Sequence, residues 1–453
     1  MFCSRILAGA AGVFLLAGCS VNLGGALGMG GSTKAAALVV GDEPYAVKVG
    51  VATLAQGGDA ADAATAMYFA LAVSYPVAAG LGGGGICIVH DPLHNRSEEF
   101  DFLTRDAAGG GAYAVPGNVR GFALIQGTYG IMPWQKVVAP AEGYARAGFP
   151  ISRALATRLT AAEDVIRLDA GLASEFMDES GHVKSAGSIT SNAELADTLS
   201  AIRTQGTNAF YTGAIGDKIV TYSTAQGGTI SASELSAYHS DRGTPRVTQL
   251  GSDYVYMPAT RTGAGAFAGA LLDNLSREQA TPAGLNDAEA TVIAAVKRTL
   301  DGFGVKSLPS DLGATGFAVT DSSGQAVACA VTMNGPFGSG HTVLGTGVTL
   351  ARAPSSGDAG LASAFLTPVI AGPRGDGAAT LVGAGAGGPN GTASIAYALA
   401  RVVRGDEILT RNALHSTGVA PYDTVNAIVC SNEICAALAD PAANGFGTAV
   451  PGR

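Results

Sequence analysis

Charged side chains are scarce in this chain. Only 14% of its 453 residues are Asp, Glu, Lys or Arg, and the formal net charge is -9. Nucleic-acid binding requires clustered Lys and Arg to neutralise phosphates, and the sequence holds no such cluster. Aromatic residues make up 6% of the chain, too few for a platform on which bases stack. We therefore expect no nucleic-acid partner.

Spacings typical of metal and cofactor sites are also missing. The six histidines are scattered and no Cys/His grouping has zinc spacing, so we expect no metal. The glycines of residues 80–85 match a dinucleotide fingerprint but follow a predicted helix and precede a strand, the reverse of the required order. The glycines of 383–388 have the right order, but no second parallel strand with a terminal acid follows. A dinucleotide oxidoreductase is therefore only the third of the functions that we consider, after the two given at the end of this subsection. We expect no cofactor.

The N-terminal apolar run, Ile6–Leu16, is too short to cross a membrane as a helix. It follows Arg5 and ends in Leu16-Ala17-Gly18-Cys19, which resembles a bacterial lipobox. This resemblance implies a signal peptide over 1–18, a lipid on Cys19 and a Gly-rich tether over 19–37. Ser20 is not the Asp that favours inner-membrane retention in some bacteria. We expect a lipid-anchored protein at the periplasmic face of the outer membrane.

The remaining four cysteines form two groups. Cys87 and Cys329 lie in apolar, strand-like runs, so we expect buried thiols. Cys430 and Cys435 flank Ser-Asn-Glu-Ile between two β-compatible runs, and a hairpin there could bring them together. In an exported protein this favours a disulfide, with two unpaired cysteines as the alternative.

The chain is rich in apolar residues and in glycine. Hydrophobic residues are 47% of the sequence, which is enough for a large buried core.

Recognisable motifs lie at residues 56–64, 80–85, 115–121, 129–134, 148–152, 210–219, 234–238 and 314–334. In this order, they resemble motifs of the γ-glutamyltranspeptidases, a family of N-terminal-nucleophile hydrolases. The resemblance covers most of residues 38–402.

The resemblance implies an α+β fold, a four-layer αββα sandwich in a single domain over 38–453. Residues 38–313 would correspond to the large subunit of the family and 314–453 to the small subunit. Local patterns agree, because helical periodicity dominates before residue 80 and between 134 and 220, whereas strand-turn-strand patterns dominate 245–260 and 315–385.

The position of the family nucleophile is occupied by Ala314. In the family a Thr at this position cuts the chain before itself and then attacks the substrate. Alanine has no hydroxyl and can do neither. Thr315 is one residue away, but successive side chains of a strand point to opposite faces, and its use would require a one-residue slip that also turns Phe317 and Val319 over.

Other family positions give a mixed picture. Gly387 and Gly388 match the pair that holds the oxyanion. Thr332 and Asn334 match cleft positions. Arg105 matches the arginine that binds the substrate carboxylate, with a solvated surface charge as the alternative. Two polar pairs of the family are replaced, by Ala364-Phe365 and by Ser355-Ser356.

Two function hypotheses follow from these positions. The first is a γ-glutamyltranspeptidase-like envelope lipoprotein that is not processed and has lost its catalytic site, with a binding or structural role towards a small γ-glutamyl or amino-acid-like ligand. The second is a divergent γ-glutamyltransferase or glutathione hydrolase that cuts itself before Thr315.

Overall fold

The computed structural model describes most of the chain after the predicted tether. The described residues are 37–259, 265–279, 288–303, 311–373, 378–403, 424–431, 434–440 and 442–450. The predicted signal peptide and lipidation site, Cys19 included, lie outside these residues. Within the described part of the chain, no helix has the length and apolar character that a membrane span requires.

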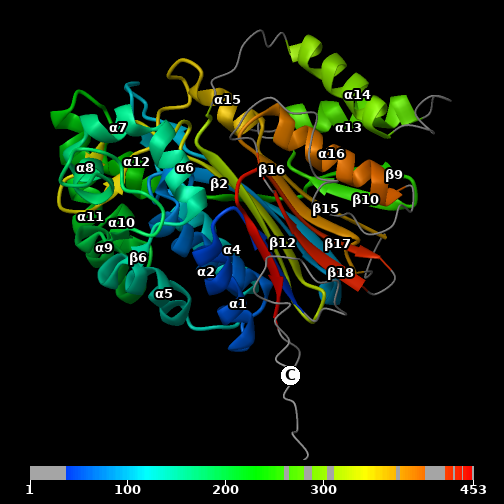
Figure 1. Ribbon diagram of the computed structural model, residues 1–453, viewed down its shortest axis with the longest axis horizontal. Coiled ribbons are helices and arrows are strands. Elements are labelled where there is room, and N and C mark those ends of the chain that lie inside the picture. Colours follow the sequence, from blue (N-terminus) through cyan, green and yellow to red (C-terminus); the bar gives the residue numbers. More distant parts are fainter. Residues whose placement is uncertain are drawn as a thin grey trace, which may run out of the picture.

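Two antiparallel sheets pack face to face at the centre of the molecule (Figure 1). The first sheet has the strand order β19 (Phe446–Ala449), β1 (Leu38–Gly41), β11 (Ala314–Thr320), β12 (Ala326–Thr332), β2 (Gly84–Asp91), β3 (Arg96–Phe102) and β8 (Asp241–Gly243). The second has the order β18 (Ile434–Ala439), β17 (Thr424–Ser431), β16 (Leu381–Ala386), β15 (Thr367–Gly372), β10 (Asp253–Met257) and β9 (Arg246–Leu250).

Helices cover the outer face of each sheet. The first sheet is covered by α1 (Pro44–Ala55), α2 (Ala60–Ser74) and α4 (Asn118–Tyr129), with α5 (Trp134–Ala147) and α9 (Ala193–Gln205) farther out. The second is covered by α16 (Pro389–Val403), against which α13 (Ala266–Gln279) and α14 (Ala288–Phe303) pack (Figure 1). The predicted four-layer α+β sandwich is therefore confirmed.

The described part of the chain contains further helices and short strands. They are α3 (Pro76–Ala79), η2 (Pro92–His94), β4 (Arg105–Asp106), β5 (Ala114–Val115), β6 (Phe149–Pro150), α6 (Arg153–Ala161), α7 (Glu163–Leu168), α8 (Ala170–Phe176), β7 (Ile189–Thr190), α10 (Asn208–Tyr211), α11 (Ala214–Ala225), α12 (Ala232–Ala237), β13 (Thr342–Val343), β14 (Val348–Thr349) and α15 (Ala359–Ala364).

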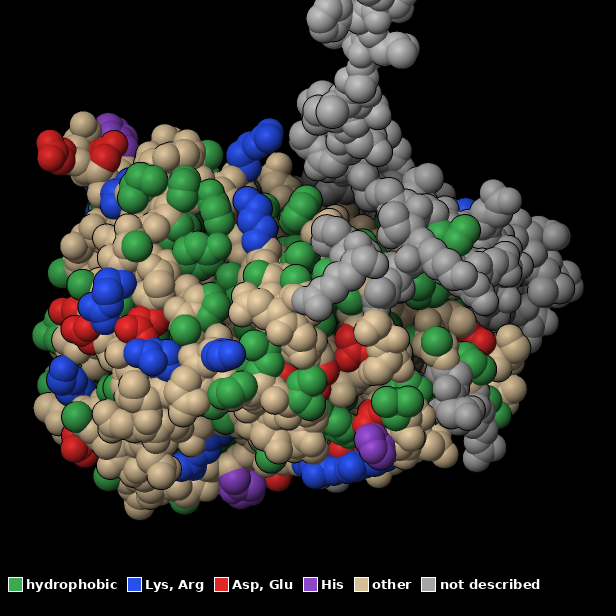
Figure 2. All heavy atoms as spheres, turned by 90° about the horizontal axis from the view of Figure 1, so that it is seen from below, with side chains coloured by type: hydrophobic (Ala, Val, Ile, Leu, Met, Phe, Trp, Pro, Cys, Tyr) green, Lys and Arg blue, Asp and Glu red, His purple; other side chains and the backbone are tan. Residues whose placement is uncertain are grey.

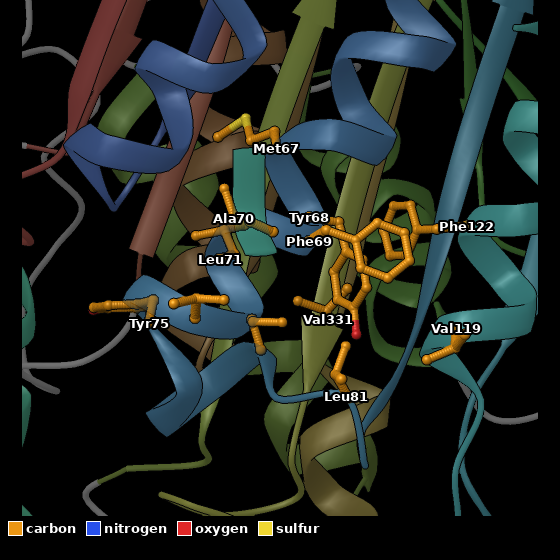
Figure 3. Close-up of a cluster of buried hydrophobic side chains, with 14 of the residues drawn as sticks. Met67, Tyr68, Phe69, Ala70, Leu71, Tyr75, Leu81, Val119, Phe122 and Val331 are labelled. Carbon is orange, nitrogen blue, oxygen red and sulfur yellow. The ribbon is translucent and has the colours of Figure 1, made fainter. Parts of the chain in front are cut away.

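Helix α2 is the central element of the first helical layer, and every one of its residues is buried. It begins at a capping box, in which the Asp59 carboxylate accepts from the backbone N–H of Asp62 and the Asp62 carboxylate accepts from the N–H of Asp59. Its aromatic side chains pack on α4, where the rings of Tyr68 and Phe122 stack with centroids 4.0 Å apart (Figure 3). This packing fixes α2 against the first sheet.

Strand β11 is buried on both faces. Phe317 and Val319 belong to the core under the helices, whereas Ala318 belongs to the core between the sheets. A Cβ added at Gly316 would lie 2.8 Å from the Cβ of Ala384 on β16, so the two sheets approach closely here because neither residue has a large side chain.

The structure corrects one expectation about the cysteines. Cys87 and Cys329 are not free thiols but form a disulfide, because the register of β2 and β12 places them directly opposite each other. Cys430 and Cys435 are also bonded, across the hairpin of β17 and β18, as favoured from the sequence.

Candidate active site

Ala314, the first residue of β11, lies in an apolar environment between the two sheets. The residue has no exposed surface. Its buried neighbours in this cluster are Ile86, Ala330, Leu366, Ala384 and Ala386. The methyl group thus fills a place in the core, and no hydroxyl is present at this position to attack a carbonyl carbon.

The chain leading into Ala314 is held by hydrogen bonds to the next strand. Thr332 lies directly opposite Ala314 in the β11–β12 register. Its hydroxyl is 3.0 Å from the carbonyl oxygen of Gly313 and 3.2 Å from that of Leu312. Gly313 has φ of 60°, and a Cβ there would lie 1.9 Å from the carbonyl oxygen of Gly335, so only glycine fits.

A buried ion pair fixes the same segment from the other side. The guanidinium of Arg158 on α6 lies 2.6 Å from the carboxylate of Asp311, and both side chains are less than a tenth exposed. The same Asp311 oxygen accepts from the backbone N–H of Gly313 at 2.7 Å. Burial opposes the charge on Arg158, but Asp311, Tyr75 and Asp42 outweigh it and raise the pKa of the guanidinium. The guanidinium of Arg158 therefore remains charged across the ordinary pH range.

Thr315 lies on the other face of β11 from Ala314, as its place in the strand predicts. Its hydroxyl donates to Asp42 Oδ2 at 2.6 Å. The other oxygen of Asp42 accepts from Asn426 Nδ2 at 2.7 Å, and Asn426 also donates to the carbonyl of Gly316 at 2.9 Å. Burial raises the pKa of Asp42, against the lowering effect of these hydrogen bonds. The network connects β11 to the second sheet.

Gly387 and Gly388 lie in the turn between β16 and α16. Ala386, just before them, packs in the same cluster as Ala314, so the structure brings this turn to the nucleophile position. Gly387 has φ of 90°, a conformation that favours glycine. Both glycines are buried, and the turn that holds them follows directly on Ala386.

Asn334 is near the same position, but its side chain is occupied by structural bonds. It donates to the Thr104 hydroxyl at 3.0 Å and to the carbonyl of Arg352 at 2.8 Å. Its backbone N–H donates to the Thr332 hydroxyl at 2.8 Å. Both Thr332 and Asn334 are buried, so they fix the loop after β12.

The side chain of Arg105 is directed elsewhere. Its guanidinium donates to the carbonyl of His239 at 2.9 Å and to Asp241 at 3.3 Å, and lies over the ring of Tyr238. The structure does not bring it to Ala314. This arrangement fits the alternative of a surface charge better than the role of a carboxylate ligand.

Two features of the replaced acidic segment were missed from the sequence. Ser355 donates to Asp106 Oδ1 from its hydroxyl at 2.8 Å and from its backbone at 3.0 Å, so a carboxylate there would face Asp106. Arg352, three residues earlier, forms an ion pair with Asp358 at 3.0 Å beside Gly335. The sequence signal for this change is Arg352, a cation in the segment where Ser355 and Ser356 replace the acids of the family.

One hollow on the described surface lies away from this site. A hollow of about 610 Å³ lies at the opposite end of β11, lined in part by Asp321, Gln325, Asp91 and Tyr129. Charged side chains of both signs are interspersed with apolar and neutral ones on the face seen in Figure 2. Among the described residues, no group of three His, Cys, Asp or Glu side chains is arranged to hold a metal ion.

Comparison with known proteins places the chain in a family. The family model "Gamma-glutamyltranspeptidase" matches residues 46–302. "Glutathione hydrolase 2" of Arabidopsis thaliana is 33% identical over 264 residues, which cover 55% of this chain and 45% of that protein. "Glutathione hydrolase proenzyme" of Escherichia coli (strain K12) is 34% identical over 230 residues, covering 46% of this chain and 39% of that protein.

The matched part of the chain thus spans less than half the length of these curated relatives. The solved structure of cephalosporin acylase from Bacillus halodurans has the same fold, with a TM-score of 0.71 and 18% identity over 92% of this chain and 96% of that chain. With more than half of its residues matched by the family model, the chain belongs to the gamma-glutamyltranspeptidase family of N-terminal-nucleophile hydrolases.

Proposed function

We propose that this protein is an unprocessed γ-glutamyltranspeptidase homologue that has lost the family's hydrolase chemistry and keeps a binding or structural role. The observation that carries the proposal is the methyl group of Ala314, packed among apolar side chains where the family has its nucleophile. Loss of a nucleophile costs a hydrolase about 10⁶-fold in rate, because the remaining groups have no covalent step to stabilise.

A second candidate function is self-cleavage before Thr315, followed by γ-glutamyl transfer. The distance of 2.6 Å between the Thr315 hydroxyl and Asp42 favours it, because a carboxyl within hydrogen-bond reach can accept the proton of a nucleophile. Against it, Thr315 is entirely buried on the face away from Gly387 and Gly388. A slip of β11 that brought it over would turn Phe317 and Val319 out of the core under the helices.

A small γ-glutamyl or amino-acid-like molecule is the ligand that we propose for the retained role. The names of the curated relatives motivate this choice of chemistry. Ser355 stands where the family has an acid, whereas the guanidinium of Arg352 nearby is paired with Asp358. We therefore propose that the amine of such a ligand is bound less strongly here than it would be beside an acid.

We further propose attachment to the membrane through a lipid on Cys19, at the periplasmic face of the outer membrane. The two disulfides support this location, because such bonds form and persist in oxidising compartments. Intact-mass measurement of the purified protein checks the proposal, since cleavage before Cys19 and acylation change the mass in opposite directions.

The test of the missing activity is a gel under reducing conditions combined with an assay on a γ-glutamyl anilide. The unprocessed chain is expected to run as one band close to its 44.9 kDa, with no anilide hydrolysed above background. Two fragments divided near residue 314, together with anilide release that the Thr315→Val variant abolishes, would establish the second candidate instead.

A further inference from the structure

We propose that the Cys87–Cys329 disulfide is a permanent covalent tie across the family's cleavage junction, formed while the chain folds and closed to thiol exchange in the folded protein. The tie does not rest on the proposed function. It connects the two parts of the chain whether the Gly313–Ala314 peptide bond is intact or cut.

The positions of the two cysteines carry the first half of the proposal. Cys87 lies in the middle of β2 and Cys329 in the middle of β12, 242 residues apart, so the junction lies between them in the sequence. Because β12 pairs with β2 along seven residue positions, the bond joins two central strands of the first sheet. A chain cut at the junction would still be one covalent molecule.

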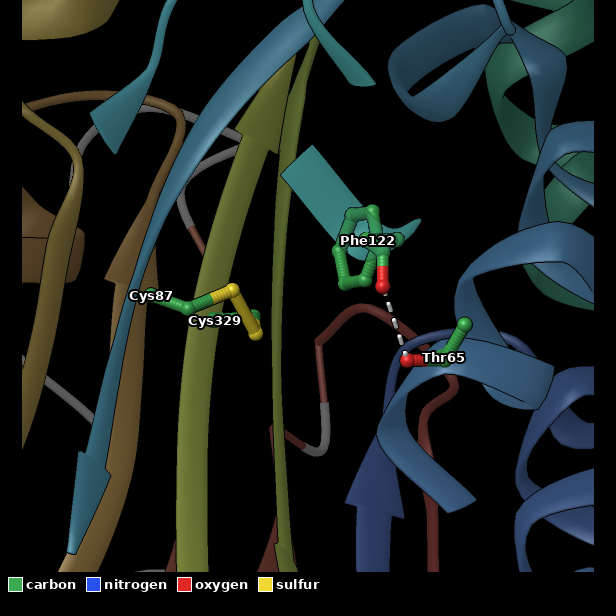
Figure 4. Close-up of a disulfide and its surroundings, with 4 residues drawn as sticks. All are labelled: Thr65, Cys87, Phe122 and Cys329. Atoms are coloured by element: carbon green, nitrogen blue, oxygen red, sulfur yellow. Dashed lines mark hydrogen bonds between the residues drawn. A yellow bond between two sulfur atoms is a disulfide. The ribbon is translucent and has the colours of Figure 1, made fainter. Parts of the chain in front are cut away.

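The burial of the two cysteines carries the second half. Neither residue has exposed surface, and both belong to the core between the first sheet and its helices. Figure 4 shows Thr65 of α2 and Phe122 of α4 on the helical side of the disulfide, joined by a hydrogen bond of 3.5 Å from the Thr65 hydroxyl to the Phe122 carbonyl. A thiolate must reach a sulfur to exchange with it, and here the helices cover the path.

An order of events follows from this burial. Oxidation of the two thiols removes two electrons and two protons, which an external disulfide must take up by direct contact with a sulfur. Such contact is excluded once α2 and α4 cover the sheet. The bond therefore forms before these helices are in place, and its state records the redox conditions under which the chain folded.

The second disulfide provides an internal control. Cys430 and Cys435 are five residues apart in one hairpin, and both are partly exposed. They also lie on the same side of the junction, so their bond cannot join the two parts. We expect it to exchange with thiols in the folded protein.

To test the tie, the recognition sequence of tobacco etch virus protease is inserted between residues 303 and 311. The oxidised, folded protein is cut and separated on denaturing gels with and without dithiothreitol. We expect a single species without the reductant and two fragments with it, and the Cys430→Ala/Cys435→Ala variant should behave in the same way. Separation of the cut wild-type protein without reductant would overturn the proposal.

Closure to exchange is tested on the uncut wild-type protein. Folded protein is treated with dithiothreitol, alkylated with iodoacetamide and analysed by peptide mass spectrometry. We expect alkylation of Cys430 and Cys435 at least tenfold above that of Cys87 and Cys329, and equal alkylation of all four after denaturation. Equal alkylation in the folded state would overturn this half of the proposal. Both experiments use the cysteine-bearing protein, so neither depends on a variant that must fold without the bond.

Discussion

The hydroxyl of Thr332 donates a hydrogen bond to the carbonyl oxygen of Gly313, 3.0 Å away, at the peptide bond that precedes Ala314. This donor polarises the carbonyl that a hydroxyl at position 314 would attack. A hydrogen-bond donor to this carbonyl is thus in place, although the attacking group is absent.

Ala314→Thr is therefore expected to restore partial self-cleavage. The new hydroxyl would lie next to a carbonyl that is already hydrogen-bonded, and the cut should appear as two fragments on a reducing gel. Ala314→Val is the matched control, because valine has the shape of threonine without the hydroxyl. Both variants crowd the apolar cluster and should lose about 1–3 kcal/mol of stability.

The contribution of Thr332 can be measured in the same background. Adding Thr332→Val to Ala314→Thr should slow the cut about 10²-fold, the usual effect of removing one donor to a developing oxyanion. Unchanged cleavage in the double variant would mean that this hydrogen bond only holds the loop.

The buried Arg158–Asp311 pair predicts a large loss of stability when one partner is removed. Arg158→Met leaves the Asp311 carboxylate without its counter-ion in a buried place, which costs about 3–5 kcal/mol. The double variant Arg158→Met/Asp311→Leu should recover part of this loss, because no charge then remains buried. Urea unfolding followed by circular dichroism provides the measurement, and a single-variant loss below about 1 kcal/mol would contradict the prediction.

Because the carboxyl of Glu43 is buried, we predict that the free energy of unfolding decreases as the pH rises. Burial raises the pKa of this carboxyl to about 7, against hydrogen bonds from Ser152 and from the backbone of Tyr45. The neutral form is favoured in the folded state, so its contribution is complete below the unfolded pKa of about 4.5 and is lost as the pH passes 7.

Between pH 5 and pH 8, ionisation of Glu43 lowers the free energy of unfolding by at most about 3 kcal/mol. Glu43→Gln should flatten the pH dependence of the unfolding free energy by that order. Glu175 has its pKa raised to about 7 by burial as well, so the remaining slope in the variant should fall again in Glu43→Gln/Glu175→Gln. An unchanged slope in both variants would assign the pH dependence to other groups.

The two disulfides should differ in their effect on stability. In the loop-entropy account, a bond that closes 242 residues stabilises by about 5 kcal/mol and one that closes five residues by about 2 kcal/mol. Cys87→Ala/Cys329→Ala should therefore lower the unfolding free energy more than Cys430→Ala/Cys435→Ala does, in guanidinium titrations without reductant. The reverse order would indicate that local strain or unfolded-state structure outweighs the loop term.

The sequence was sufficient to predict the layers of the fold and the key substitution. Ala314 could be assigned because the motif around it is continuous, and Thr315 could be placed on the opposite face because strand alternation is a local rule. The hairpin disulfide Cys430–Cys435 was accessible for the same reason, since its partners are near in sequence.

Contacts that depend on the tertiary structure could not be predicted from the sequence. Cys87 and Cys329 were expected as free thiols, because their pairing depends on the register of strands that are 242 residues apart. The Arg158–Asp311 pair joins a helix to a loop, and no local pattern marks either residue as a partner. The direction of the Arg105 side chain depends on Tyr238 and Asp241, which come from a distant segment.

The near-contact of Gly316 with Ala384 has a consequence for any attempt to re-equip this protein as a catalyst. A pocket wide enough for a tripeptide at the head of β11 would have to be opened where the two sheets meet through a hydrogen atom and a methyl group. Turnover of such a substrate would therefore require the second sheet to shift as a whole, in addition to a hydroxyl at position 314.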